Sequence, residues 1–179
     1  MWCGMTYYHW AREPVKLRRM DYVQSGFPKP NGLWFDADED WKRWCESTDY
    51  ELENLRYRHT VTVIDESRIL CLKNARAIDT FTGKYRLSLS SGIQFLQSEN
   101  ERETFTNRYG RDIFSEIQAQ FSNSISWPEV AAKYSGIIIV PFSRARSSTY
   151  LWYYGWYCAS GCVWDTSVIR LGKPHKMLR

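Results

Sequence analysis

The apolar run at residues 136–142 (GIIIVPF) constrains the fold most strongly, because it has no polar face. A strand with one solvent-facing side alternates apolar and polar residues, so this unbroken run predicts a strand buried on both faces. Such a strand needs a layer of structure on each side. A chain of 179 residues is long enough to provide these layers as one domain spanning 1–179.

Alternating β-branched and aromatic residues predict further strands on both sides of this run. These strands are expected at residues 6–10, 57–64, 69–72, 150–156 and 161–171. Short helices are expected at 15–23 and 129–134, and a longer one at 99–121, while the pattern of 75–98 is ambiguous. Ser126 is a candidate N-cap for the helix at 129–134, with Pro128 at an early position. Together, these strands and helices predict an α+β domain of two packed, mainly antiparallel sheets with short inserted helices.

Residues 32–45 (GLWFDADEDWKRWC) place tryptophans on a strand and on the helix that follows it. Trp34 leaves the strand on one face, and Trp41 and Trp44 are spaced to share one face of a helix. The acidic residues 36–40 between them favour the positive end of that helix. Aromatic residues make up 16% of the chain, which suggests a ligand surface. The alternative is that these tryptophans only pack in the core or on the surface.

Charge and cysteine content exclude some classes of protein. The net charge is +4, and the basic residues of 172–179 are expected to form a flexible tail rather than a nucleic-acid contact. Five scattered cysteines and no apparent signal peptide favour free thiols in a reducing, cytoplasmic setting. No apolar stretch reaches the roughly 20 residues of a membrane helix, and the three histidines and the cysteines lack the spacing of a zinc site.

Two motifs resemble the ADP-ribosyltransferases of the diphtheria-toxin-like and poly(ADP-ribose) polymerase-like class. The first is His9 within TYYHWA, and the second is residues 32–35 (GLWF) followed by a helix that ends in Trp44 and Cys45. The resemblance implies an ADP-ribosyltransferase-like fold with NAD as substrate. It also implies that Trp34 and Trp44 hold the nicotinamide ring, with Phe35 completing the strand motif, while His9 hydrogen-bonds the ribose and the amide.

The physical chemistry of NAD agrees with this expectation. The nicotinamide ring is flat and cationic in NAD, so an indole on each face attracts it by stacking and cation–π contact, worth roughly 0.5 to 2 kcal/mol. Breaking the glycosidic bond gives an oxocarbenium-like centre, which an acidic residue usually stabilises.

The late strand departs from the family pattern at this acid. The family often has Glu there, but SGCVWD places Ser160 at that position and Asp165 at the end of the motif. The candidate catalytic residues are therefore His9, Ser160 and Asp165. A basic loop at 143–149 is expected over the cleft, where Arg144 and Arg146 would gate the cleft or meet the pyrophosphate or the target.

The sequence thus predicts an NAD-binding protein that transfers ADP-ribose to a macromolecular acceptor, either protein or nucleic acid. An RNA 2′-phosphotransferase shares the general fold, but no motif favours it. The alternative is a non-catalytic module that binds peptide or nucleic acid through its aromatic surface, and the loss of the Glu fits that alternative better.

Overall fold

The computed structural model describes residues 5–25, 29–87 and 124–177. Its centre is one mixed β-sheet with the strand order β4-β5-β6-β2-β1-β3-β7, and β8 pairs with β3 beyond that path. The strands are β1 (Tyr7–Ala11), β2 (Leu33–Ala37), β3 (Tyr57–Val63), β4 (Ile69–Leu72), β5 (Gly136–Ile139), β6 (Ser160–Val163), β7 (Ile169–Leu171) and β8 (His175–Lys176). The helices are α1 (Asp40–Thr48), α2 (Ala75–Tyr85), α6 (Trp127–Ala131), α7 (Arg144–Ser147) and α8 (Leu151–Tyr154). Short 3-10 turns are η1 (Leu52–Leu55), η2 (Glu66–Arg68) and η3 (Thr166–Val168).

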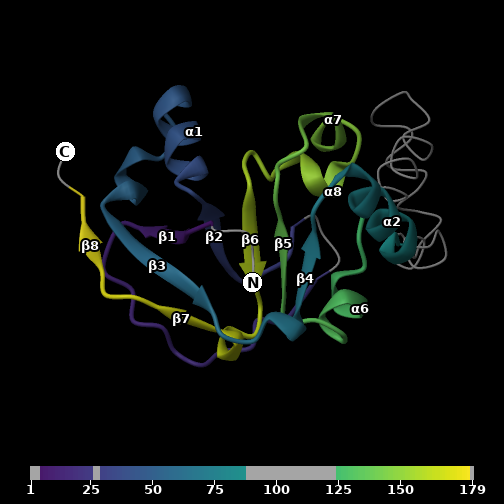
Figure 1. The fold of residues 1–179 in the computed structure, drawn as a ribbon, viewed down its shortest axis with the longest axis horizontal. Helices are drawn as coiled ribbons and strands as arrows, with labels where there is room; N and C mark the ends of the chain where they lie inside the picture. The colour runs from purple at the N-terminus through teal and green to yellow at the C-terminus, as the bar shows by residue number, and fades with distance from the viewer. Residues whose placement is uncertain (1–4, 26–28, 88–123, 178–179) are drawn as a thin grey trace, which may run out of the picture.

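The sheet curls strongly along its length. In Figure 1, β4, β5 and β6 run upright, whereas β1, β3 and β7 lie across the other half of the molecule. Only the β4–β5 pair is parallel among the described strand pairs, and the others are antiparallel. The predicted α+β class is therefore confirmed, but the expected two sheets form one, because β2 pairs with β6 on one edge and with β1 on the other.

The apolar run at 136–142 forms β5 at the centre of the upright half, as its pattern predicts. Ile137 and Ile139 pack into a core covered by α2, α6 and α8, which we call the helix-side core. Ile138, between them, packs into a second core on the opposite face, with Phe35 and Val163. Because side chains alternate across a strand, each face of the sheet has its own core, and β5 is buried on both faces.

Several predicted elements are confirmed, and three are wrong. Strands at 6–10, 57–64 and 69–72 and the strand of GLWF all form, and the helix expected at 129–134 forms as α6, which begins earlier, at Trp127. Residues 15–23 contain no helix, the expected loop at 143–149 contains α7, and the expected strand at 150–156 contains α8. Trp152, Tyr153 and Trp156 are buried in the helix-side core at helical spacing, so packing there overrides their β propensity. The helix predicted at 99–121 lies outside the described residues.

Two further segments differ in detail from the sequence pattern. The expected strand at 161–171 is divided by η3 into β6 and β7, and the ambiguous segment begins with α2. The segment expected as a basic tail is described to residue 177. It pairs with β3 through β8, and Gly172 N–H donates to Thr60 O at 2.8 Å.

Candidate ligand-binding cleft

The sheet opens between β1 and β2, and this opening positions the site. Only Tyr7 and Tyr8 of β1 pair with β2, whereas β1 stays paired with β3 along all five of its residues. β2 meanwhile remains paired with β6 from Leu33 to Asp36. The two strands therefore diverge after Tyr8, and the backbone of β2 near Trp34 is free to meet side chains from β1.

A cavity of about 470 Å³ lies at this divergence, within the size range of small-molecule pockets. Its lining comes from β1, β2, α1, η1 and the segment that leads into β6. The lining residues are Tyr8, His9, Trp10, Ala11, Arg12, Lys29, Trp34, Phe35, Asp36, Trp41, Glu51, Asn54, Gly155, Trp156, Cys158 and Ser160. Four of the residues proposed from the sequence, His9, Trp34, Phe35 and Ser160, border this single cavity.

His9 bridges the opening. Its Nδ1 lies 2.7 Å from the carbonyl oxygen of Trp34, which can only accept a hydrogen bond. Burial lowers the pKa of His9, although the bond to Trp34 acts in the opposite direction. The ring is therefore neutral near pH 7, with its proton on Nδ1, and Nε2 keeps a lone pair with no partner among the described residues.

Trp34 presents its indole beside another tryptophan and a lysine. Trp156 meets Trp34 edge to face, with ring centroids 4.7 Å apart. The Nζ of Lys29 lies over the Trp34 ring at 5.2 Å from its centroid and over the Tyr157 ring at 5.3 Å. Trp34 and Tyr157 thus form a surface that already binds a cation.

Trp44 does not line the cavity. Its ring stacks on Trp41 at 5.0 Å and on Tyr157 at 4.5 Å, with Tyr50 against it at 5.3 Å. We call Trp41, Trp44, Tyr50 and Tyr157 the aromatic cluster. Trp41 is the α1 tryptophan that borders the cavity, and Trp44 supports it from one turn further along the helix.

Asp36 is a buried carboxyl in the lining, with 1% of its surface exposed. The indole N–H of Trp10 donates to its Oδ1 at 3.0 Å, and the backbone N–H of Trp41 donates to its Oδ2 at 2.8 Å. Burial raises the pKa of Asp36 to about 6, against the opposing effect of these hydrogen bonds. Asp36 belongs to β2, yet it accepts a hydrogen bond from a backbone N–H in the first turn of α1. From its place on the strand, this residue of the acidic run therefore stabilises the start of the helix.

Ser160 lies opposite Asp36 in the β2–β6 register, and its hydroxyl donates to Cys158 O at 3.1 Å. Phe35 borders the cavity, but its ring packs with Tyr7 in the core of the opposite face, at a centroid distance of 5.4 Å. The structure therefore brings His9, Trp34 and Ser160 together around Asp36, and it gives Phe35 a packing contact.

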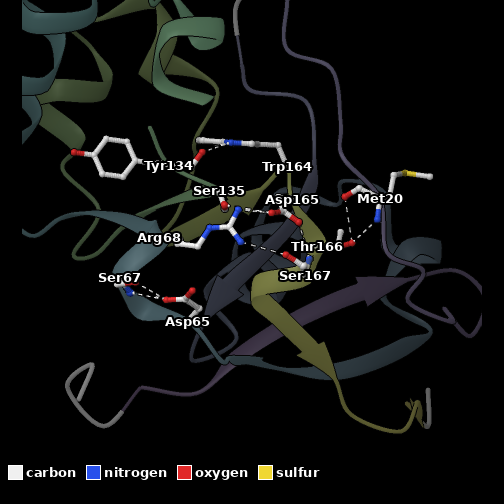
Figure 2. A network of polar contacts seen from close by, with 10 residues as sticks. All are labelled: Met20, Asp65, Ser67, Arg68, Tyr134, Ser135, Trp164, Asp165, Thr166 and Ser167. Atoms are coloured by element: carbon white, nitrogen blue, oxygen red, sulfur yellow. Dashed lines mark hydrogen bonds and ion pairs between the residues drawn. The ribbon is translucent and has the colours of Figure 1, made fainter. Parts of the chain in front are cut away.

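Asp165 lies beyond the other end of β6 and does not line the cavity. Figure 2 shows it among Arg68, Ser135 and Ser167. Arg68 Nη2 lies 2.5 Å from Asp165 Oδ2. Burial acts to raise the pKa of Asp165, but hydrogen bonds from Ser167 and Arg68 outweigh it and lower the pKa to about 2. Asp165 also accepts a bond from Ser167 N that opens η3, which is a structural contact.

Arg144 lies on α7, is exposed and does not line the cavity. The neighbouring Arg146 forms a two-point contact with Asp79 of α2, with both N to O distances at 2.7 Å. This contact attaches α7 to α2. The basic segment 143–149 therefore packs beside the helix-side core in the structure.

The sequence pattern missed Asp36, Lys29 and Tyr157 as site residues. Asp36 belongs to the acidic run at 36–40, which also predicts the start of a helix. The run alone therefore did not indicate that Asp36 is buried. Lys29 and Tyr157 lie far from Trp34 in sequence, and only the fold places Lys29 against both rings. The alternation of Leu33 and Phe35 with Trp34 and Asp36 was the signal available for Asp36, because it places Asp36 on the face of Trp34.

The lining of the cleft includes one thiol, that of Cys158. None of Cys45, Cys71, Cys158 and Cys162 forms a disulfide bond within the described residues, and burial raises the pKa of Cys158 to about 12. Within residues 5–25, 29–87 and 124–177, no cluster of His, Cys, Asp and Glu has the composition to hold a metal ion. The helices in the described part of the chain are all too short or too polar to cross a membrane.

Comparison with protein-family models, with curated proteins and with solved structures finds no match to this chain.

Proposed function

We propose that this chain is an ADP-ribosyltransferase-like domain that binds NAD in the cleft between β1 and β2. It would transfer ADP-ribose to a protein or nucleic-acid acceptor. The observation that carries the proposal is the contact between His9 and Trp34, whose motifs lie 25 residues apart in sequence and meet at 2.7 Å in the cleft. The sequence motifs of both residues indicate one ligand, the nicotinamide riboside part of NAD.

The protonation of His9 supports a role at the ribose. With the Nδ1 proton donated to Trp34, the Nε2 lone pair accepts a hydrogen bond from a ribose hydroxyl. The Trp34 face supports the other half of the ligand, because it already attracts the Lys29 ammonium and the nicotinamide of NAD is also a cation.

Asp36 supplies the buried carboxyl of the proposed site. When the glycosidic bond breaks, its electron pair leaves with nicotinamide and positive charge develops on the ribose. A carboxylate near that charge stabilises it, and the acceptor then bonds to the ribose carbon and loses its proton. Asp36 lies opposite Ser160, where the resemblance places the usual Glu, so a carboxyl is present across the β2–β6 pair.

The test begins with NAD binding to the whole chain. Saturating NAD should raise the melting temperature and quench tryptophan fluorescence, and Trp34→Ala should remove both effects. Trp41→Ala should weaken binding more than Trp44→Ala, because Trp41 borders the cavity. Unchanged melting and fluorescence in the wild-type protein would remove NAD from the proposal.

Labelled NAD in a host lysate then tests the transfer. Label on a protein, DNA or RNA that disappears with His9→Ala supports a transferase. NAD that binds without any labelled product leaves the second candidate, a binding module without chemistry. The exposed part of the aromatic cluster favours that candidate, since Tyr50 and Tyr157 are 43% and 39% exposed. Cysteines without a disulfide bond fit a cytoplasmic setting in either case.

A further inference from the structure

Lys29 holds its ammonium group against two rings, that of Trp34, which lines the cleft, and that of Tyr157. Its Nζ lies 5.2 Å from the Trp34 centroid and 5.3 Å from the Tyr157 centroid. No ion pair joins Lys29 to a carboxylate within the described residues. Two aromatic faces therefore provide the main attraction for this charge. Burial partly removes the ammonium group from water and lowers the pKa of Lys29.

The fold makes room for the Lys29 side chain at Gly155. A Cβ on Gly155 would collide with Lys29 Cε and would lie 2.9 Å from its Nζ. Gly155 is the residue after α8, and both Gly155 and Lys29 line the cavity. The lysine stem is thus packed into the wall of the cleft, with its charged end on the face of Trp34.

We propose that Lys29 is an intramolecular competitor for this site, and that a flat organic cation binds to Trp34 and Tyr157 only after the lysine side chain leaves. The inference rests on the proposed function for the identity of the cation, the nicotinamide ring of NAD. The ammonium and the ring need the same electron-rich faces, so the two cannot occupy them together. The apparent affinity for the ring is then reduced by the fraction of molecules in which Lys29 has left.

The experiment compares a charged and a neutral ring of nearly equal shape. Isothermal titration measures the binding of 1-methylnicotinamide, which is a cation, and of nicotinamide, which is neutral. Lys29→Ala should bind 1-methylnicotinamide roughly tenfold more tightly than wild type. The gain in affinity for nicotinamide should be smaller, because the aromatic faces attract a cationic ring more strongly than a neutral one once the ammonium group is absent.

Two further variants separate competition from a general change in the fold. Lys29→Gln keeps most of the stem and removes the charge, so it should also bind the cation more tightly if Lys29→Ala folds poorly. Lys84→Ala is the matched control, because Lys84 Nζ lies over the Tyr85 ring at 5.1 Å and Lys84 does not line the cavity. It should leave both affinities unchanged. Equal affinities for the cation in wild type, Lys29→Ala and Lys29→Gln would overturn the inference, and so would an equal gain in Lys84→Ala.

NAD titrated into the same variants keeps this inference distinct from the proposed function. Tighter binding of 1-methylnicotinamide to Lys29→Ala, with no binding of NAD by any variant, would support the competitor and remove the NAD function. Equal NAD affinity in wild type and Lys29→Ala would support NAD binding and overturn the competitor. Failure of wild type and both Lys29 variants to bind either ligand would overturn both.

Discussion

The indole nitrogen of Trp10 donates a hydrogen bond of 3.0 Å to Asp36, and this bond joins β1 to β2 just beyond the point where their backbone pairing stops. The second carboxylate oxygen of Asp36 accepts from the backbone N–H of Trp41 in the first turn of α1. One buried carboxyl therefore fixes the positions of two strands and one helix that form walls of the cleft.

Asp36 should make stability fall as pH rises. Its pKa in the folded chain is about 6, above the ordinary 3.8, so the folded state holds a proton that the unfolded state has released. Stability attributable to this proton is fully present below about pH 4 and is lost as pH rises to about 6, by about 3 kcal/mol at most. Urea unfolding of wild type and Asp36→Asn between pH 4 and pH 7.5 measures this difference.

The control for Asp36 is an exposed acid on the neighbouring helix end. Asp49→Asn, at the C-cap of α1, should leave the pH dependence of unfolding as it is in wild type. A free-energy difference between wild type and Asp36→Asn that stays constant from pH 4 to pH 7.5 would contradict the raised pKa of Asp36.

His9 and His59 should respond differently to removal, although they are paired across β1 and β3. His59 is fully buried, with Nε2 accepting from Val15 N at 3.1 Å and Nδ1 3.0 Å from Gly172 O. His59→Ala should lower the free energy of unfolding by about 3 kcal/mol, because it leaves a cavity and removes the hydrogen-bond partner of two backbone groups. His9→Ala should cost about 1 kcal/mol and should lower NAD affinity. Urea unfolding and NAD titration decide this, and a larger stability loss for His9 would make it the structural histidine.

The strands that carry the cleft were predictable because their patterns are local. TYYHW and GLWF alternate, and an alternating run keeps its strand period wherever it pairs. The pairing of β2 with β6 was not predictable, since it joins residues more than 100 positions apart in sequence. The single sheet, where two were expected, follows from that non-local pairing.

The site residues divide in the same way. His9 and Trp34 stand out within short motifs, and the structure brings them into contact. Trp44 has the right spacing for the helix face, but Trp41, one turn earlier on α1, borders the cavity and stacks on Trp44. Asp165 was a candidate only because of its place in the late-strand motif. It lies just after β6, at the end of that strand away from the cleft.

Asp165 and Arg68 should form a stabilising pair with no part in ligand binding. The pKa of Asp165 is lowered to about 2, so its contribution is present above about pH 4 and is lost as pH falls toward 2. Asp165→Asn should cost about 1 kcal/mol at pH 7, because Arg68 is half exposed. A double-mutant cycle with Arg68→Ala measures the coupling. NAD affinity should stay at the wild-type value, and a tenfold loss in Asp165→Asn would place this carboxyl in the site.

Ser160→Glu should destabilise the chain because it restores an acid opposite one that is already buried. Ser160 and Asp36 are Cα partners in the β2–β6 pair, and both are largely inaccessible to water. Like charges directly opposite each other in a sheet repel, and here neither is solvated. We expect a loss of about 3 kcal/mol at pH 7.5 relative to wild type, with a smaller loss in Ser160→Gln, which matches Glu in size.

The pH dependence and a second substitution separate repulsion from crowding. The difference between Ser160→Glu and Ser160→Gln should shrink near pH 4, where both carboxyls are protonated. Adding Asp36→Asn to Ser160→Glu should recover stability at pH 7.5, because the double variant moves the single carboxyl from β2 to β6. Equal unfolding free energies for Ser160→Glu and Ser160→Gln at pH 7.5 would show that Asp36 does not repel a carboxylate at position 160. The expected coupling would explain why this chain has Ser at position 160: the cleft has room for one buried carboxyl, and Asp36 already provides it.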